Sequence, residues 1–318
     1  MVEERKKPKV SIIGAGAVGI RYAYSLMIKG LARSIVILDK NQEKAQGEVM
    51  DLNHGMPYIS PVEVTVGKNS NLAGSDLVVI TAGAKQKPGQ TRIDLIKENI
   101  QVFRSIIPGI MEYAADAIFL VVTNPVDVLS YATCRISGKS WHQVIGSGCV
   151  LDSARFRYLL SQHCRIDARN IHAYILGEHG DTEFPVWSRV MIGGILFDNY
   201  CPVCGRCKSP KLTRNSIFES VRDSAYKIIE KKGETSYGIG LALVRITQAI
   251  LKDENAVLPV STFVDGDYGI HDVYLSLPCV VNKLGIREVL NIVLDDEEIS
   301  KLRHSAEAIK AVIRDSGL

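Results

Sequence analysis

The middle of the sequence contains four polar side chains that could act together in one reaction: Arg92, Asp152, Arg155 and His179. A histidine can donate a proton near neutral pH, and a buried aspartate beside it would fix its tautomer and favour its protonated form. One arginine could bind a carboxylate, and another on a closing loop could polarise a carbonyl. Hydride transfer to a 2-keto acid needs these groups together. Taken singly, each has a simpler explanation, as a solvated charge or a structural histidine.

The first half of the chain alternates short apolar runs with longer segments of helical periodicity. Runs that are apolar at every position suit strands covered on both faces, as in a parallel sheet. Strand and helix in this order predict right-handed crossovers and an α/β fold with a doubly wound parallel sheet. The predicted strands are residues 9–13, 34–38, 77–80, 118–122 and 144–145, and the predicted helices are residues 18–29, 42–52 and 92–114.

A glycine-rich turn joins the first predicted strand to the first predicted helix. Gly14, Gly16 and Gly19 form a G-x-G-x-x-G pattern, which permits a tight turn, a close approach to a pyrophosphate and close helix packing. Asp39 ends the second predicted strand, where a carboxylate can bind ribose hydroxyls and repels a 2′-phosphate. The pattern therefore predicts a Rossmann-type site for NAD rather than NADP, although the adjacent Lys40 weakens that preference. The alternative is a glycine turn without a ligand.

From about residue 150 the pattern changes to a mixed α+β order. Helices are predicted over residues 214–232 and 239–252, antiparallel strands over 256–264 and 272–282, and a C-terminal helix that starts with four acidic residues at 295–298. We therefore divide the chain into an NAD-binding domain at residues 1–148 and a substrate-binding, catalytic domain at residues 149–318. No Pro/Gly/Ser linker separates the two halves, so we expect them to pack closely.

Several further motifs recur in one family. The glycine turn, Val122-Thr123-Asn124-Pro125, and the blocks at residues 152–157, 177–182 and 233–238 are specific in combination. With them the sequence resembles the L-lactate/malate dehydrogenase family over nearly the whole chain, and within it the bacterial L-lactate dehydrogenases. The resemblance implies a reversible transfer of hydride between NADH and pyruvate, giving L-lactate.

The resemblance also implies a role for each matched residue. His179 would be the proton donor and acceptor, Asp152 its partner, Arg155 the group that binds the substrate carboxylate, and Arg92 the carbonyl polariser. Substrate contacts would also come from Gln86, Asn124 and Thr235. The cofactor-binding positions would be Gly14, Gly16, Val18, Gly19, Asp39, Thr81, Gly83, Asn99, Val122 and Asn124. Family members carry a cis peptide bond before the proline that matches Pro125. A non-catalytic nicotinamide-binding relative is the alternative from another class.

Substrate choice depends on Gln86 in this resemblance. Malate dehydrogenases carry an arginine at the matching position, because oxaloacetate brings a second carboxylate that is costly to bury unpaired. The neutral Gln86 favours the methyl group of pyruvate or a modestly larger alkyl group. Lys85 and Lys87 could serve a dicarboxylate, but they are poor substitutes for a guanidinium fork. Malate and branched 2-hydroxy acids are the weaker alternatives.

Arg157 and His172 match positions at which allosteric bacterial lactate dehydrogenases bind fructose 1,6-bisphosphate across a subunit interface. Cations from two subunits would bind phosphate only in the assembled state. Relatives without this response share the arginine, so an ordinary interface or surface residue is an equal alternative. The resemblance implies a homotetramer, which composition alone does not show.

Composition excludes several classes of protein. The 318 residues carry a net charge of +3, too small to predict a nucleic-acid-binding surface. The longest apolar run is far shorter than the roughly 18 residues of a membrane span, and the N-terminus lacks the apolar region of a secretory signal. Seven cysteines, an odd number, favour a reducing cytoplasm over secretion.

Cys201, Cys204 and Cys207 are the least explained residues of the sequence. Their C-x2-C-x2-C spacing resembles part of an iron–sulfur or zinc site, but Lys211 stands where the ferredoxin-like spacing would place a fourth cysteine. Another histidine or a second subunit could complete such a site. Free or oxidisable loop thiols are the favoured interpretation, so we assign no metal ligand.

Overall fold

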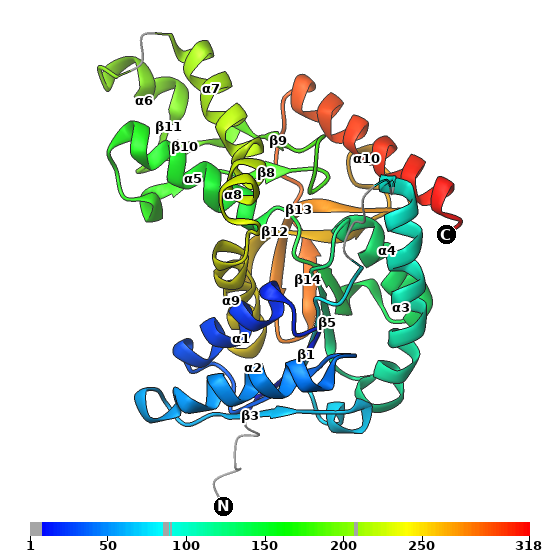
Figure 1. The fold of residues 1–318 in the computed structure, drawn as a ribbon. Coiled ribbons are helices and arrows are strands. Elements are labelled where there is room, and N and C mark those ends of the chain that lie inside the picture. Colours follow the sequence, from blue (N-terminus) through cyan, green and yellow to red (C-terminus); the bar gives the residue numbers. More distant parts are fainter. Residues whose placement is uncertain (1–7, 85–88, 90, 207–208) are drawn as a thin grey trace, which may run out of the picture.

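The computed structural model describes residues 8–84, 89, 91–206 and 209–318, without the side chains of Arg92 and Pro210. Within these residues a nine-stranded sheet runs through the molecule, with helices on both faces (Figure 1). The strand order is β14-β13-β12-β6-β5-β4-β1-β2-β3. The strands are β1 Lys9–Ile13, β2 Ser34–Leu38, β3 Glu63–Val66, β4 Leu77–Ile80, β5 Ile118–Val121, β6 Val144–Gly146, β12 Ala256–Val264, β13 Val273–Asn282 and β14 Gly285–Val289.

The six N-terminal strands are parallel and doubly wound; the apolar runs predicted this sheet and five of its strands, all but β3. Strand β1 lies between β2 and β4, so the direction of winding reverses there; in open α/β sheets the ligand crevice lies at the carboxyl ends of the strands at such a point. Helices α1 and α2 with α9 cover one face, and α3 and α4 with α10 cover the other. These helices are α1 Ala17–Lys29, α2 Gln42–His54, α3 Arg92–Ala114, α4 Val126–Ser137, α9 Tyr237–Leu251 and α10 Asp296–Ser316.

Strand β1 shows why the apolar runs are continuous. Val10 and Ile12 belong to the core under α1 and α9, whereas Ile13 belongs to the core under α3 and α10. Because side chains alternate between the two faces of a strand and both faces are covered, almost every position is apolar. The α/β class with a doubly wound sheet and a following α+β part is confirmed.

The two halves of the chain share the sheet. Strands β12, β13 and β14 pair antiparallel, as predicted for the first two, and Ser261 of β12 pairs with Gly146 of β6. Helix α1 also packs against α9. The sequence predicted close packing but not one continuous sheet. The division at residues 148 and 149 falls between β6 and α5, and we retain it as a proposal.

A smaller lobe with its own apolar core lies beside the sheet, around Phe156, Phe197 and Cys201 (Figure 1). The predicted helix 214–232 is wrong as a single element, because it is divided at Asp223, a residue type that favours helix ends. The remaining elements are α5 Val150–Cys164, β7 Ile171–His172, β8 Ile175–Leu176, β9 Phe184–Pro185, β10 Met191–Ile192, β11 Ile195–Leu196, α6 Phe197–Val203, α7 Pro210–Arg222 and α8 Ser224–Lys232. Short 3-10 helices lie at Met56–Tyr58, Asn69–Leu72, Trp141–Gln143, Ala168–Asn170, Trp187–Arg189 and Asp267–Gly269.

In the part of the chain that the structure describes, no helix combines the length and the apolar character that a membrane span requires.

Candidate active site

The glycine turn between β1 and α1 has the geometry of a phosphate-binding loop. Gly14 has a φ of +115°, and a Cβ there would lie 2.8 Å from the backbone nitrogen of Ala82. A Cβ on Gly19 would lie 2.1 Å from the carbonyl oxygen of Gly14, so only glycine lets the helix pack this closely on the turn. A Cβ on Gly16 would meet nothing within 4 Å, so that side of the turn has room for a ligand.

Charge around this turn suits a dinucleotide. The Asp39 carboxylate accepts hydrogen bonds from the backbone N–H groups of Ala15 at 2.7 Å and Asn41 at 2.8 Å, which hold it beside the turn. Helix α1 has neither a side-chain cap nor an acidic residue in its first turn, which includes Val18, so its positive end is not neutralised by its own side chains. A carboxylate for ribose and a helix N-terminus for pyrophosphate fit NAD and disfavour a 2′-phosphate.

The loops after β4 and β5 form the neighbouring wall of the crevice. Thr81 donates a hydrogen bond from Oγ1 to the carbonyl oxygen of Gly14 at 3.0 Å. Asn99 accepts from the backbone N–H of Ala84 at 2.7 Å and donates to the carbonyl oxygen of Asn124 at 3.1 Å. One buried side chain of α3 therefore fixes both loops.

The loop after β5 lies against the loop after β4. The peptide bond between Asn124 and Pro125 is cis, as the resemblance implied. A Cβ on Gly83 would lie 2.5 Å from Cγ2 of Thr123, so the two loops touch. Val122, which precedes this contact, is almost fully buried. These proposed cofactor positions thus lie together along the carboxyl edge of the parallel sheet.

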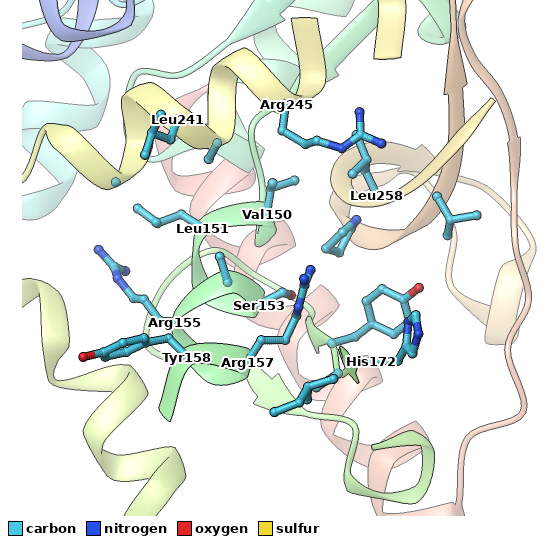
Figure 2. Close-up of a pocket in the computed structure, with 18 residues that line it drawn as sticks. Val150, Leu151, Ser153, Arg155, Arg157, Tyr158, His172, Leu241, Arg245 and Leu258 are labelled. Carbon is cyan, nitrogen blue, oxygen red and sulfur yellow. The ribbon is translucent and has the colours of Figure 1, made fainter. Parts of the chain in front are cut away.

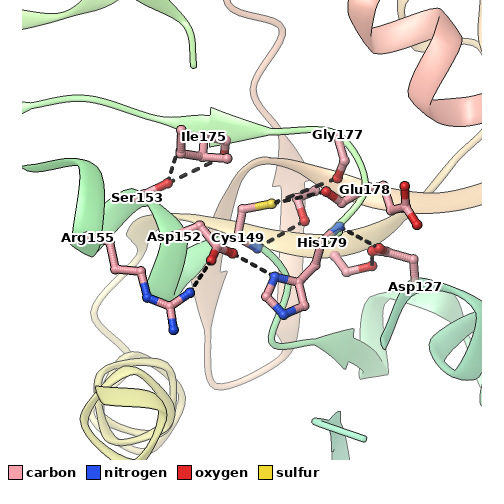
Figure 3. Close-up of polar contacts among 11 residues, drawn as sticks. Asp127, Cys149, Asp152, Ser153, Arg155, Ile175, Gly177, Glu178 and His179 are labelled. Atoms are coloured by element: carbon pink, nitrogen blue, oxygen red, sulfur yellow. Dashed lines mark hydrogen bonds and ion pairs between the residues drawn. The ribbon is translucent and has the colours of Figure 1, made fainter. Parts of the chain in front are cut away.

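His179, Asp152 and Arg155 form a hydrogen-bonded chain (Figure 3). His179 lies in the loop after β8, and its Nδ1 is 2.6 Å from Oδ2 of Asp152 in the first turn of α5. The guanidinium of Arg155 donates to Oδ1 of the same carboxylate at 2.8 Å. The second ring nitrogen of His179 points away from Asp152 (Figure 3), where a substrate oxygen can receive its proton.

The electrostatics of this group favour a protonated histidine. Burial lowers the pKa of His179, but the charge and hydrogen bond of Asp152 outweigh it and raise that pKa to about 9. Burial raises the pKa of Asp152, yet His179 and then Arg155 hold it below its usual value. At neutral pH the pair is therefore imidazolium and carboxylate, with Nδ1–H donating to Asp152.

The histidine loop is fixed to the rest of the protein from several sides. The backbone N–H of His179 donates to Oδ2 of Asp127 at 2.8 Å, and Oδ1 of Asp127 accepts from the hydroxyl of Ser261 at 2.5 Å. Gly177 has a φ of +93°, and a Cβ there would lie 2.7 Å from Oγ of Ser305. Such contacts restrict the orientation of the imidazole before substrate binds.

Three groups of this site were missed in the sequence: Asp127, Cys149 and Glu183. The ligand atoms of Cys149, Asp152, His179 and Glu183 all lie within 4.8 Å of one another. Burial, and then the charge of Asp152, raise the pKa of Glu183 to about 8. Glu183 follows His179 by four positions and Asp127 follows Pro125 by two, so sequence proximity was an available signal, but their burial was not.

Other predicted substrate residues are placed only in part. Gln86, with its neighbours Lys85 and Lys87, lies outside the described residues. Arg92 begins α3, where Thr91 caps the helix, but its side chain also lies outside the described part. The structure places Thr235 half-buried in the loop between α8 and α9.

Arg157 and His172 line a common cavity of about 770 Å³ (Figure 2). Arg157 extends from α5, His172 from β7, and Arg245 from α9 on the opposite side. Much of the remaining lining is apolar, including Leu241 and Leu258. The two residues that the sequence linked to an anionic effector therefore do lie together.

Together, the doubly wound fold, the glycine turn after β1 and the protonated His179 define an NAD-dependent dehydrogenase. The chain belongs to the lactate/malate dehydrogenase family: the family's NAD-binding domain matches residues 8–146 and its alpha/beta C-terminal domain matches residues 149–316. Its cofactor is NAD, which the residues of the crevice fit.

Curated relatives and solved structures agree with this family. The chain is 54% identical to an L-lactate dehydrogenase of Acetivibrio thermocellus over 96% of both chains. It is 49% identical to one of Priestia megaterium over 96% of this chain and 95% of that one. A solved lactate dehydrogenase from a Medee basin deep-sea metagenome library has a TM-score of 0.95 at 42% identity, covering 98% of this chain and all of that one. The minor L-lactate dehydrogenase of Enterococcus mundtii has a TM-score of 0.94 at 40% identity, covering 97% of this chain and 98% of that one.

Proposed function

We propose that this chain is an NAD-dependent L-lactate dehydrogenase that interconverts pyruvate and L-lactate. The observation that carries the proposal is the hydrogen-bonded chain of His179, Asp152 and Arg155, with a histidine that is protonated at neutral pH. The relatives named L-lactate dehydrogenase, at about half identity over almost the whole chain, support the same activity.

The side chains of this site can supply each element of the reaction apart from the hydride. NADH, when bound, supplies a hydride to the carbonyl carbon of pyruvate. His179 gives the carbonyl oxygen a proton from its outer ring nitrogen, while Nδ1–H stays with Asp152. Arg155 holds the substrate carboxylate, and Arg92 polarises the carbonyl. In the reverse direction neutral His179 takes the proton of the lactate hydroxyl.

The substrate proposal depends on Gln86. A neutral side chain at this position leaves the second carboxylate of oxaloacetate without a partner, so pyruvate is the better substrate. The test is NADH oxidation by the purified chain with pyruvate and with oxaloacetate. We expect a higher kcat/KM for pyruvate, and a swing toward oxaloacetate in Gln86→Arg.

Each outcome of this assay discriminates among the alternatives. A preference for oxaloacetate in the wild type would favour a malate dehydrogenase, and turnover of only larger 2-keto acids would favour a branched-chain enzyme. NADH binding without any turnover would favour the non-catalytic protein. An unchanged substrate preference in Gln86→Arg would mean that Gln86 does not determine the choice between pyruvate and oxaloacetate.

We also propose that the cavity of Arg157 and His172 binds fructose 1,6-bisphosphate between subunits of a cytoplasmic homotetramer. Two guanidinium groups, of Arg157 and Arg245, and the imidazole of His172 around one opening support a doubly phosphorylated ligand. Fructose 1,6-bisphosphate should lower the KM for pyruvate and shift the sedimentation of the wild type toward the tetramer. Neither effect should occur in Arg157→Gln. If the bisphosphate changes nothing in the wild type, Arg157 is an interface or surface residue.

A further inference from the structure

A second cluster of possible metal ligands lies at the other end of α5 from the catalytic pair. His163 occupies the last turn of α5, Cys201 lies on α6, and Cys204 is the residue that ends α6. A ring nitrogen of His163 and the two Sγ atoms all lie within 4.8 Å of one another. The fold thus brings a histidine to the Cys201–Cys204 pair, which is the kind of ligand that the sequence lacked.

The surroundings of this cluster suit a soft metal ion. Cys201 is fully buried in the core of the small lobe, and His163 and Cys204 are half-buried at its edge. Thiolate sulfur and imidazole nitrogen are the ligands that zinc prefers in proteins, and two cysteines separated by two to four residues commonly supply half of such a site. The Arg206 guanidinium donates to the carbonyl oxygen of Cys204 at 3.4 Å, so a cation that favours thiolates lies nearby.

We propose that His163, Cys201 and Cys204 bind one zinc ion, which ties the end of α5 to the end of α6. On binding, the two thiols release two protons and the neutral imidazole donates its lone pair, so the site carries no net charge. The fourth tetrahedral position is open to water. Cys207 continues the cysteine spacing but lies outside the described residues, so the three described ligands carry the proposal.

The site requires the reduced chain. Cys201 is disulfide-bonded in the structure, whereas Cys204 is a free thiol. Zinc binds thiolate, so the disulfide and the metal exclude each other. A dithiol or a phosphine must first reduce the disulfide with two electrons, and each sulfur takes up one proton as the S–S bond breaks. The dithiol is oxidised to a disulfide; a phosphine takes up the oxygen of a water molecule and becomes a phosphine oxide. Zinc binding should therefore depend on reduction.

Zinc binding at this cluster should stabilise the small lobe and leave the catalytic reaction unchanged. His163 is about 16 Å from Asp152 along the helix axis, at about 1.5 Å per residue. The ion would link α5 to a segment almost forty residues further along the chain and so restrict the unfolded state, as a cross-link does. Zinc should raise the Tm of the reduced chain, because it binds only the folded protein.

The test uses the full chain, reduced with a phosphine, freed of metal by a chelator and then equilibrated with Zn²⁺ or Co²⁺. We expect about one zinc per chain, a rise in Tm, and a thiolate-to-cobalt charge-transfer band with Co²⁺. Cys204→Ser and His163→Gln should weaken zinc binding at least about 100-fold, because each removes a ligand. Matched controls are Cys134→Ser and His54→Gln, which lie outside the cluster and should bind zinc as the wild type does.

Several results would overturn the proposal. One is a reduced wild-type chain that binds no zinc, and another is equal zinc binding by the reduced and the oxidised chain. Zinc that remains bound in both Cys204→Ser and His163→Gln and abolishes turnover would place the ion at Cys149, Asp152, His179 and Glu183 instead. His163→Gln keeps a polar, half-buried side chain, so its result remains interpretable if a cysteine variant folds poorly.

Discussion

Helix α5 supplies side chains to two clusters, one at each end, and each cluster contains a histidine. At the first turn, Asp152 holds His179 in an ion pair, and the pKa of this histidine is raised to about 9. At the last turn, burial and then the charge of Arg206 lower the pKa of His163, and its neighbours are the sulfur atoms of Cys201 and Cys204. The first histidine is therefore a proton donor at neutral pH, whereas burial and Arg206 favour the neutral form of the second.

The comparison shows that neighbouring charge decides what a histidine can do. A carboxylate at 2.6 Å favours imidazolium, which cannot bind a metal ion, although Cys149 and Glu183 bring further ligand atoms within reach. At His163, burial and the guanidinium of Arg206 favour neutral imidazole, which can bind a metal ion. The distribution of carboxylates thus separates an acid–base site from a candidate metal site on one helix.

The largest effect should come from removing the proton donor. His179→Asn keeps a polar side chain but no group that titrates near neutral pH, so kcat for pyruvate reduction should fall by about 10³-fold. NADH affinity, measured by fluorescence titration, should stay unchanged, because the nucleotide residues lie on other loops. His54→Gln is the matched control and should keep full turnover. A His179→Asn enzyme with normal kcat would contradict the assigned role.

A smaller loss should follow from Arg155→Lys, which keeps the charge but removes the guanidinium fork. Losing one of two charge-assisted hydrogen bonds to the substrate carboxylate should raise the KM for pyruvate about 10- to 100-fold. Steady-state kinetics would measure this, with Arg33→Lys, an exposed arginine, as the control. An unchanged KM would mean that Arg155 serves Asp152 alone, through their 2.8 Å contact.

Local patterns in the sequence predicted most of the sheet. The apolar runs of β1, β2, β4 and β5 match the structure closely, because burial on both faces leaves its mark at every residue. Strand β3 was not predicted, since it lies at the sheet edge and reads EVTV with half its residues polar. The junction of β12 with β6 was also missed, because pairing between distant segments leaves no local pattern.

For the site, the sequence predicted the groups that carry chemistry but not their neighbours. His179, Asp152 and Arg155 were found through residue type and motif. Glu183 and Asp127 were not, because an acidic residue looks the same in sequence whether it is buried or solvated. His163 was missed for a related reason: its approach to the cysteines depends on how α5 packs against α6, which no spacing along the chain encodes.

The smallest effect, and the sharpest test of the electrostatic comparison, should come from Glu183→Gln. Ionised Glu183 is among the charges that raise the pKa of His179, so removing it should lower that pKa. The loss of pyruvate reduction at alkaline pH should then begin at a lower pH than in the wild type, by less than about one unit. In the wild type that fall should occur as pH rises through about 9, where His179 loses its proton. Initial rates from pH 6 to 10, roughly spanning these pKa values, would measure the shift.

A stability measurement separates this electrostatic role from a packing role. The folded-state pKa of Glu183 is raised from 4.5 to about 8, so between these values the folded protein holds a proton that the unfolded chain has lost. The wild type therefore loses stability from this group as pH rises through that window, whereas the amide introduced by Glu183→Gln does not titrate. Denaturant unfolding should measure the free energy of unfolding of both proteins at several pH values. As pH increases, we expect Glu183→Gln to become more stable relative to the wild type. A difference that stays constant with pH, with an unmoved rate profile, would assign Glu183 to packing alone.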